Sequence, residues 1–191
     1  MNFTKIKKAM SLIEGWFALR VKRFFSPNIV FSNVRTLGAP VLLLEKGGRL
    51  ELGGKVLLNS FNDDYHLSMY SPVKLVVRSG AVISIGEETR FHASCINARQ
   101  KVVLGKRCLV AANCQIMDSN AHEIFLPPGV KRIDSVDEPR AVFIGDDVWL
   151  GTGVVVLPGA NIPCGAVVPA YSKISASTKF VEKQGVLFPM L

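Results

Sequence analysis

The stretch that decides the fold is IGDDVWLGTGVVVLPGANIPCGAVVPAYSKI, residues 144–174. An aliphatic residue recurs at every sixth position, and a small or β-branched residue stands four places after each. The aliphatic residues are Ile144, Leu150, Val156, Ile162, Val168 and Ile174, and the second set is Val148, Val154, Ala160, Ala166, Ser172 and Thr178. Neither a helix period of about 3.6 nor a strand period of about 2 produces this spacing. A fixed repeat predicts a solenoid, here a parallel β-helix with three units of six in each triangular coil.

The segment IGDDVWLGTGVVVLPGANI resembles the hexapeptide signature of left-handed β-helix acyltransferases, above all in its run Val148-Trp149-Leu150-Gly151. Within that superfamily it is most similar to maltose and galactoside acetyltransferases and to capsule or lipopolysaccharide O-acetyltransferases of bacteria. The resemblance is specific over about 80–180, weak over 40–80 and absent for the N-terminal helix. It implies an all-β, left-handed parallel β-helix. The handedness comes from the resemblance alone, because periodicity does not give it and the usual crossover is right-handed.

The start of the chain has the pattern of an amphipathic helix. Apolar residues recur in steps of three and four, at Phe3, Ile6, Met10, Ile13, Phe17, Val21 and Phe24. Ser26-Pro27 is a plausible stop. We therefore divide the chain into an N-terminal helix over 1–26, a β-helix domain over 28–178 and a C-terminal cap over 179–191.

A long loop interrupts the repeat. Ile116 and Ile144 are 28 positions apart, which is not a multiple of six, so residues 117–142 are expected to be extruded from the solenoid. Long loops on rigid scaffolds commonly carry function. A second irregular stretch, FNDDYHLSMYSP at 61–72, contains Asp63, Asp64 and His66, which we interpret as loop residues in solvent.

The charge distribution gives no reason to expect a nucleic-acid partner. The net charge is +8, but residues 1–26 hold six Lys and Arg against one Glu, so +5 lies there and +3 elsewhere. The four cysteines have no CxxC pairing, which favours free thiols and a cytoplasmic protein. The basic, aromatic-rich helix is typical of one that contacts a membrane surface, which would place the protein at the inner face. The alternative is a helix that packs on the solenoid or on another subunit.

His122 is the candidate catalytic base. In the resembled acetyltransferases a histidine stands at this place in the extruded loop and removes the proton from the acceptor hydroxyl. An imidazole of near-neutral pKa suits that step, since a sugar hydroxyl is a poor nucleophile until its proton is taken. Asp118 could orient the imidazole, bind a sugar hydroxyl or cap the loop.

The resemblance also implies an acetyl-CoA site in a groove along the coils, between neighbouring subunits. Trp149, Gly151 and Thr152 match its signature positions, and Ala170 and Ser175 match later ones. Lys173 or Lys179 could meet the CoA phosphates. The chain departs from the family in reading Pro169-Ala170-Tyr171-Ser172 and in having Ala176 where a lysine is usual. Asn97, Asn113 and Asn120 are candidates for contact with the acceptor.

These features predict an acetyl-CoA-dependent O-acetyltransferase of a surface glycan or its precursor, with direct transfer in a ternary complex and no metal. The resemblance implies a homotrimer. Alternatives are N-acetylation of an amino sugar, a membrane-anchored scaffold without activity, and a zinc hydratase. The last would need His66, His92 and His122 to converge on one metal ion.

Overall fold

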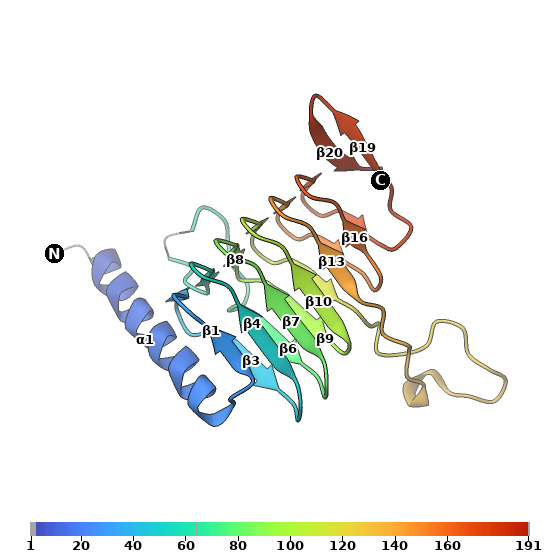
Figure 1. The fold of residues 1–191 in the computed structure, drawn as a ribbon, viewed down its shortest axis with the longest axis horizontal. Coiled ribbons are helices and arrows are strands. Elements are labelled where there is room, and N and C mark those ends of the chain that lie inside the picture. Colours follow the sequence, from blue (N-terminus) through green and yellow to red (C-terminus); the bar gives the residue numbers. More distant parts are fainter. Residues whose placement is uncertain (1–2, 64, 191) are drawn as a thin grey trace.

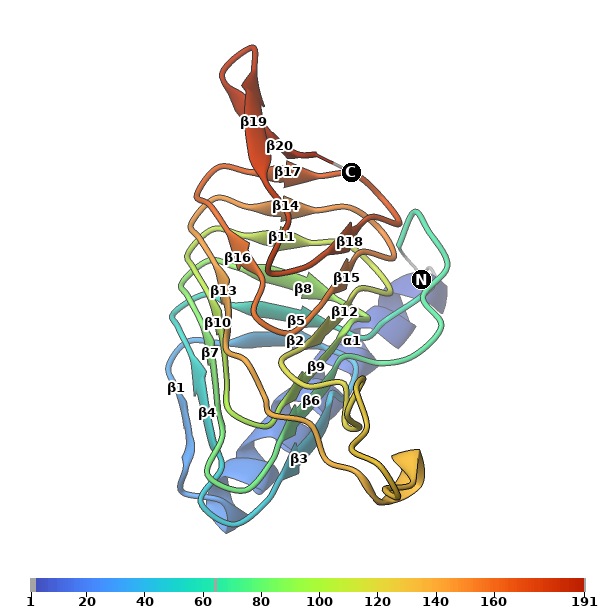
Figure 2. The ribbon, with the colours of Figure 1, turned by 90° about the vertical axis from the view of Figure 1, so that its right-hand side faces the viewer.

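The computed structural model describes residues 3–63 and 65–190, apart from the side chain of Phe3. A long helix, α1 (Phe3–Phe25), precedes a stack of six parallel coils, and an antiparallel hairpin follows them (Figure 1). Each coil adds one short strand to each of three parallel sheets, which form the sides of a triangular prism (Figure 2). The parallel β-helix expected from the repeat is therefore present.

The three sheets have the same pattern of pairing, coil upon coil. Sheet A contains β1 (Ile29–Phe31), β4 (Arg49–Leu52), β7 (Val82–Ile85), β10 (Lys101–Leu104), β13 (Val142–Ile144) and β16 (Asn161–Ile162). Sheet B contains β2 (Arg35–Leu37), β5 (Leu57–Asn59), β8 (Arg90–His92), β11 (Leu109–Val110), β14 (Trp149–Leu150) and β17 (Val167–Val168). Sheet C contains β3 (Val41–Leu44), β6 (Lys74–Val77), β9 (Cys95–Ala98), β12 (Gln115–Met117), β15 (Val155–Val156) and β18 (Lys173–Ile174).

The core is the interior of the prism. All six aliphatic residues of the repeat are at most 2 % exposed, and their registers bring like positions together, as in the pairing of Ile144 with Ile162. The small residues that precede the strands are also buried, except half-buried Thr178. Because each coil is too short to bury its own apolar side, stacking supplies the core.

Glycines at the corner between sheets A and B allow the coils to stack closely. A Cβ atom on Gly86 would lie 2.5 Å from the carbonyl carbon of Gly105, and one on Gly145 would lie 2.5 Å from the backbone nitrogen of Cys164. No side chain fits at those distances, so the repeat needs glycine there.

Two loops leave the prism at different corners. Residues 60–73 connect β5 to β6 between sheets B and C, and residues 118–141 connect β12 to β13 between sheets C and A. The second loop contains a single 3₁₀ turn, Arg132–Asp134, and extends far from the coils (Figure 1).

The two ends of the solenoid are covered differently. At the last coil, β19 (Phe180–Lys183) and β20 (Val186–Pro189) form a hairpin whose Leu187 bridges to Ala166 of the preceding coil. At the first coil, α1 packs against β2 and β1. Among the residues that the structure describes, no helix is long and apolar enough to cross a membrane.

Candidate active site

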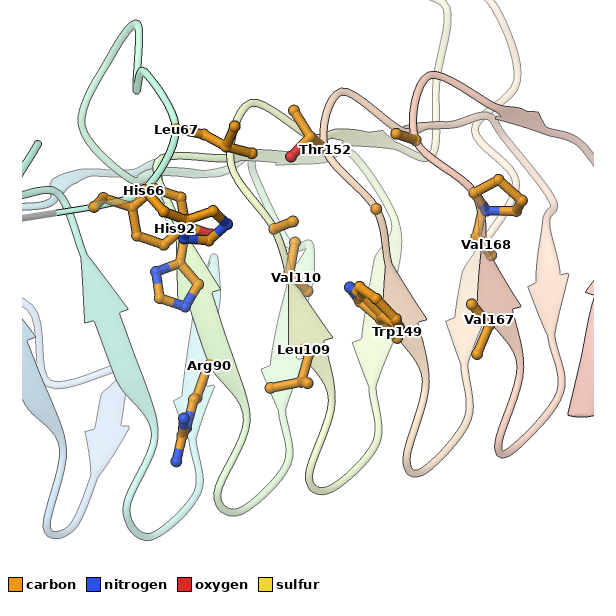
Figure 3. A pocket seen from close by; sticks show the side chains of 15 residues that line it. His66, Leu67, Arg90, His92, Leu109, Val110, Trp149, Thr152, Val167 and Val168 are labelled. Carbon is orange, nitrogen blue, oxygen red and sulfur yellow. The ribbon is translucent and has the colours of Figure 1, made fainter.

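A pocket lies on sheet B and its corner with sheet C, spanning coils of the signature segment (Figure 3). It has a volume of about 650 Å³, within the range of small-molecule sites. Four residues expected on the donor side line it, namely Trp149, Gly151, Thr152 and Ala170. Its remaining wall is largely aliphatic and includes Leu109, Val110, Val167 and Val168. The structure thus brings most of the predicted donor-side set together.

Lys173 and Ser175 do not line this pocket. Lys173 is exposed on β18 of sheet C, and Ser175 lies at the corner between sheets C and A, where its hydroxyl pairs with those of Ser177 and Thr178. Lys173 and Ser175 therefore lie apart from the Trp149 pocket within one chain, and their contact with acetyl-CoA stays a prediction.

The other end of the pocket holds Tyr65, His66 and His92, none of which the sequence marks as part of a donor or acceptor site. The ring of Tyr65 stacks on that of His92 with 4.7 Å between centroids, and lies 4.4 Å from that of His66. Asp64 lies outside the described residues, and Asp63 pairs with Lys7 of α1. Loop 60–73 thus folds over the corner and completes the pocket.

The tautomer of His92 follows from its neighbours. Asn59 accepts the backbone N–H of Phe61 through Oδ1 at 2.9 Å, which turns its Nδ2 amide towards His92 Nδ1 at 3.1 Å. Since the amide nitrogen can only donate, Nδ1 accepts and the ring proton sits on Nε2. Burial, and next the charge of Arg90, lower the pKa of His92 to about 4. His92 is therefore a neutral imidazole at physiological pH with an N–H available to the pocket.

His122 is exposed on the other loop, and the structure does not place it among the residues that line the pocket. Its Nδ1 lies 3.0 Å from the backbone carbonyl oxygen of Ser135. A carbonyl only accepts, so Nδ1 donates to it, and in the neutral ring the lone pair is then on Nε2. This is the form of imidazole that can act as a base.

The segment before His122 is held by residues that the sequence did not single out. Buried Asp137 accepts hydrogen bonds from the Ser119 hydroxyl and from the backbone N–H of Asn120, each at 2.5 Å. The hydroxyl of buried Ser135 accepts the N–H of Glu123 at 3.1 Å. Both residues come more than ten positions after His122, and no local pattern marks them.

Asp118 does not orient His122, which corrects one expectation. Its side chain is fully buried, and its carboxylate accepts backbone N–H groups of Arg99, Gln100 and Lys101 at 2.7–2.8 Å. Of the three roles open to it, the structure shows capping, although it caps the turn of the neighbouring coil rather than its own loop.

The asparagines expected to contact the acceptor are dispersed. Asn113 is committed to loop 60–73: its Nδ2 donates to the carbonyl of Ser68 and its Oδ1 accepts the N–H of Tyr70. Asn97 lies on β9 of sheet C, away from the pocket lining, with a buried Oδ1 that has no hydrogen-bond partner. Asn120 is exposed beside His122.

No group of three or more His, Cys, Asp or Glu side chains in the described ranges is arranged to hold a metal ion.

Comparisons with known proteins agree on one activity. No family model matches the chain. It is 36 % identical over 88 residues to the Escherichia coli (strain K12) protein named "Putative lipopolysaccharide biosynthesis O-acetyl transferase WbbJ", covering 41 % of this chain and 42 % of that protein. It is 28 % identical over 92 residues to the polysialic acid O-acetyltransferase of Neisseria meningitidis, covering 48 % and 39 %. The chain therefore spans less than half the length of the curated relatives it matches.

Two crystal structures have the same fold. The polysialic acid O-acetyltransferase OatWY matches with a TM-score of 0.60 at 22 % identity, covering 83 % of this chain and 74 % of that one. The polysialic-acid-specific acetyltransferase NeuO matches with a TM-score of 0.55 at 16 % identity, covering 84 % and 78 %. The chain is therefore a left-handed parallel β-helix of the hexapeptide-repeat kind, similar in sequence to O-acetyltransferases.

Proposed function

We propose that this protein is an acetyl-CoA-dependent O-acetyltransferase that acts on a sugar hydroxyl of a bacterial-type surface glycan or its precursor. The observation that carries the proposal is the state of His122, whose Nδ1–H donates to the Ser135 carbonyl and whose exposed Nε2 is free to accept a proton. The names of the two relatives, one from lipopolysaccharide biosynthesis and one acting on polysialic acid, favour a glycan hydroxyl over an amino group.

The chemistry needs one base and two bound substrates. His122 Nε2 takes the proton of the acceptor hydroxyl while its oxygen attacks the thioester carbonyl. The tetrahedral intermediate then collapses, the C–S bond breaks, and the imidazolium returns the proton to the departing CoA thiolate. Direct transfer leaves no acyl group on the enzyme. The Ser135 carbonyl stabilises the imidazolium, because the hydrogen bond that it accepts from Nδ1–H is stronger when the ring is charged than when it is neutral.

The sheet B pocket is the proposed acetyl-CoA site. Its aliphatic wall and Trp149 suit an uncharged pantetheine arm, and Gly151 and Ala170 leave room beside the corner. The Nε2–H of neutral His92, at the other end, would donate to an acceptor oxygen.

We further propose a homotrimer, because one chain does not hold a complete site. His122 projects from the corner between sheets C and A, whereas the pocket opens on sheet B and its corner with sheet C. A second copy would bring its own loop 118–141 against the pocket of the first. Closed rings with head-to-tail contacts form repeated sites of this kind.

Free thiols at buried Cys108 and Cys114 suit a reducing cytoplasm, which also supplies acetyl-CoA.

The test is turnover of acetyl-CoA, followed by release of free thiol, with polysialic acid, lipopolysaccharide core oligosaccharides and simple sugars as acceptors. We expect His122→Ala to lose roughly 10²–10⁴-fold in kcat with acetyl-CoA binding retained. Lys131→Ala, an exposed change on the same loop, is the matched control and should keep the wild-type rate. A His122→Ala rate equal to that of wild type on an accepted glycan would refute the assignment of the base.

A further inference from the structure

The N-terminal helix presents its apolar stripe to solvent instead of to the solenoid. The side chains of Met10, Ile13, Phe17 and Phe24 are 64 %, 70 %, 62 % and 83 % exposed. They recur in steps of three, four and seven, so they form one line along the helix. We call this line, with Trp16 at its edge, the outer stripe. It coincides with the periodic apolar pattern of the sequence, so the residues that define the helix as amphipathic are not those that attach it.

The helix packs on the solenoid through its opposite face, which consists of few buried positions. Ser11, Gly15 and Leu19 are the buried positions of α1 in the described part of the chain. The approach at Gly15 is so close that an added Cβ would lie 2.5 Å from Thr36 Oγ1 and 2.6 Å from the Gly38 carbonyl oxygen. The helix therefore cannot roll to bury the outer stripe without losing this contact.

The charge of the helix favours one of the two surfaces that could cover the outer stripe, which are a second copy of this chain and an anionic membrane. Residues 1–26 carry +5, with Lys5 and Lys22 exposed and the Arg20 guanidinium 4.0 Å above the ring of Trp16. A second copy packed face to face would oppose two equally basic helices. An anionic bilayer surface would instead pair the cations with lipid phosphates and accept the aromatic rings at the level of the headgroups.

We propose that the outer stripe of α1 inserts into the surface of an anionic membrane. Since α1 lies across the first coil, at one end of the stack (Figure 1), the helix would lie in the plane of the interface with the coils standing above it. Met10, Ile13, Phe17 and Phe24 would enter the boundary between headgroups and acyl chains, while Ser11, Gly15 and Leu19 keep the helix on the solenoid. The proposal does not depend on catalysis, because binding to lipid requires neither substrate.

The experiment is co-flotation of the full-length protein with phosphatidylcholine vesicles containing roughly 30 % phosphatidylglycerol, and with pure phosphatidylcholine vesicles. We expect wild type to float with the anionic vesicles, to bind neutral ones at least roughly tenfold more weakly, and to be released by salt. Ile13→Ser/Phe17→Ser should lower binding to anionic vesicles by roughly tenfold or more. Met190→Ser, 58 % exposed beyond the opposite end of the solenoid, is the control and should bind like wild type.

Two further measurements keep the outcome interpretable. Circular dichroism melting shows whether the double variant is folded, and equal melting with lost flotation supports the proposal. Mass photometry shows the oligomeric state. A double variant that floats as well as wild type overturns the proposal. So does a fall in its mass without lipid, which would mean that a second copy covers the stripe.

Discussion

At the scale of residues, hydrogen-bond partners decide the roles of three polar groups. His122 is exposed, with Nδ1 on a backbone carbonyl, whereas Asp118 is buried against three N–H groups of a neighbouring coil. His92 is uncharged because its surroundings desolvate it. Residue type made all three candidates for chemistry, but only the first has the free atom that a base requires.

Asp118→Ala is expected to destabilise the fold rather than to remove a catalytic group. Three backbone N–H groups lose their buried acceptor, so the free energy of unfolding should fall by about 2–4 kcal/mol, measured by urea denaturation. Asp118→Asn keeps one side-chain oxygen and should lose less. A variant with wild-type stability and a collapsed kcat would contradict the capping role.

The lowered pKa of His92 predicts that the free energy of unfolding depends on pH. The unfolded ring titrates near about 6.5, while the folded ring stays neutral down to about pH 4. Between these values the unfolded state binds more protons, so stability falls as the pH drops from about 6.5 to about 4. His92→Gln removes this titration. Urea denaturation at about pH 7 and about pH 5 should show a smaller loss in the variant, and equal losses would count against the neutral buried ring.

At the scale of elements, close approach at Gly15 and burial of Leu19 set the face by which α1 packs, and the longer apolar stripe does not. The periodic stripe predicted an amphipathic helix, and the helix is present at Phe3–Phe25. Its contact with the solenoid uses Leu19 together with Ser11 and Gly15, and the last two are residues that a hydrophobic pattern does not weight. The close approach is at Gly15, where the backbone of α1 reaches Thr36 and Gly38 because no side chain intervenes.

Gly15→Ala should therefore lower the melting temperature. Alanine favours an isolated helix over glycine by about 1 kcal/mol, but here its Cβ would overlap Thr36 and Gly38. Thermal denaturation and limited proteolysis of α1 measure the effect. Glu14→Ala, a change at the exposed position just before Gly15, is the control. A melting temperature equal to or above that of wild type would show that the contact is looser than described.

At the scale of the whole molecule, the solenoid separates the two halves of the proposed site. Loop 118–141 leaves the prism between sheets C and A, whereas the Trp149 pocket lies on sheet B and its corner with sheet C, so the proposed transfer would use a neighbouring copy.

A mixture of two inactive variants tests this arrangement. His122→Ala and Trp149→Ala, each inactive alone, should regain activity when co-expressed, because random assembly leaves roughly a quarter of shared sites intact. Mixed oligomers of His122→Ala with His122→Ala/Trp149→Ala are the control and should stay inactive. Absence of recovery in a confirmed mixed oligomer would place both groups in one chain.

The sequence by itself determined the coils, because the six-residue repeat sets which side chains point inwards and the glycines allow neighbouring coils to approach closely. It also indicated His122 and the signature side of the pocket, since these depend on local motifs. The tertiary structure alone decided the partner of His122, the capping role of Asp118, the pocket built by Tyr65 and His92, and the outward face of α1. Each of these features depends on contacts between residues far apart in the chain or on the steric fit of two surfaces. Long-range contacts and steric fit produce no repeating pattern in the sequence.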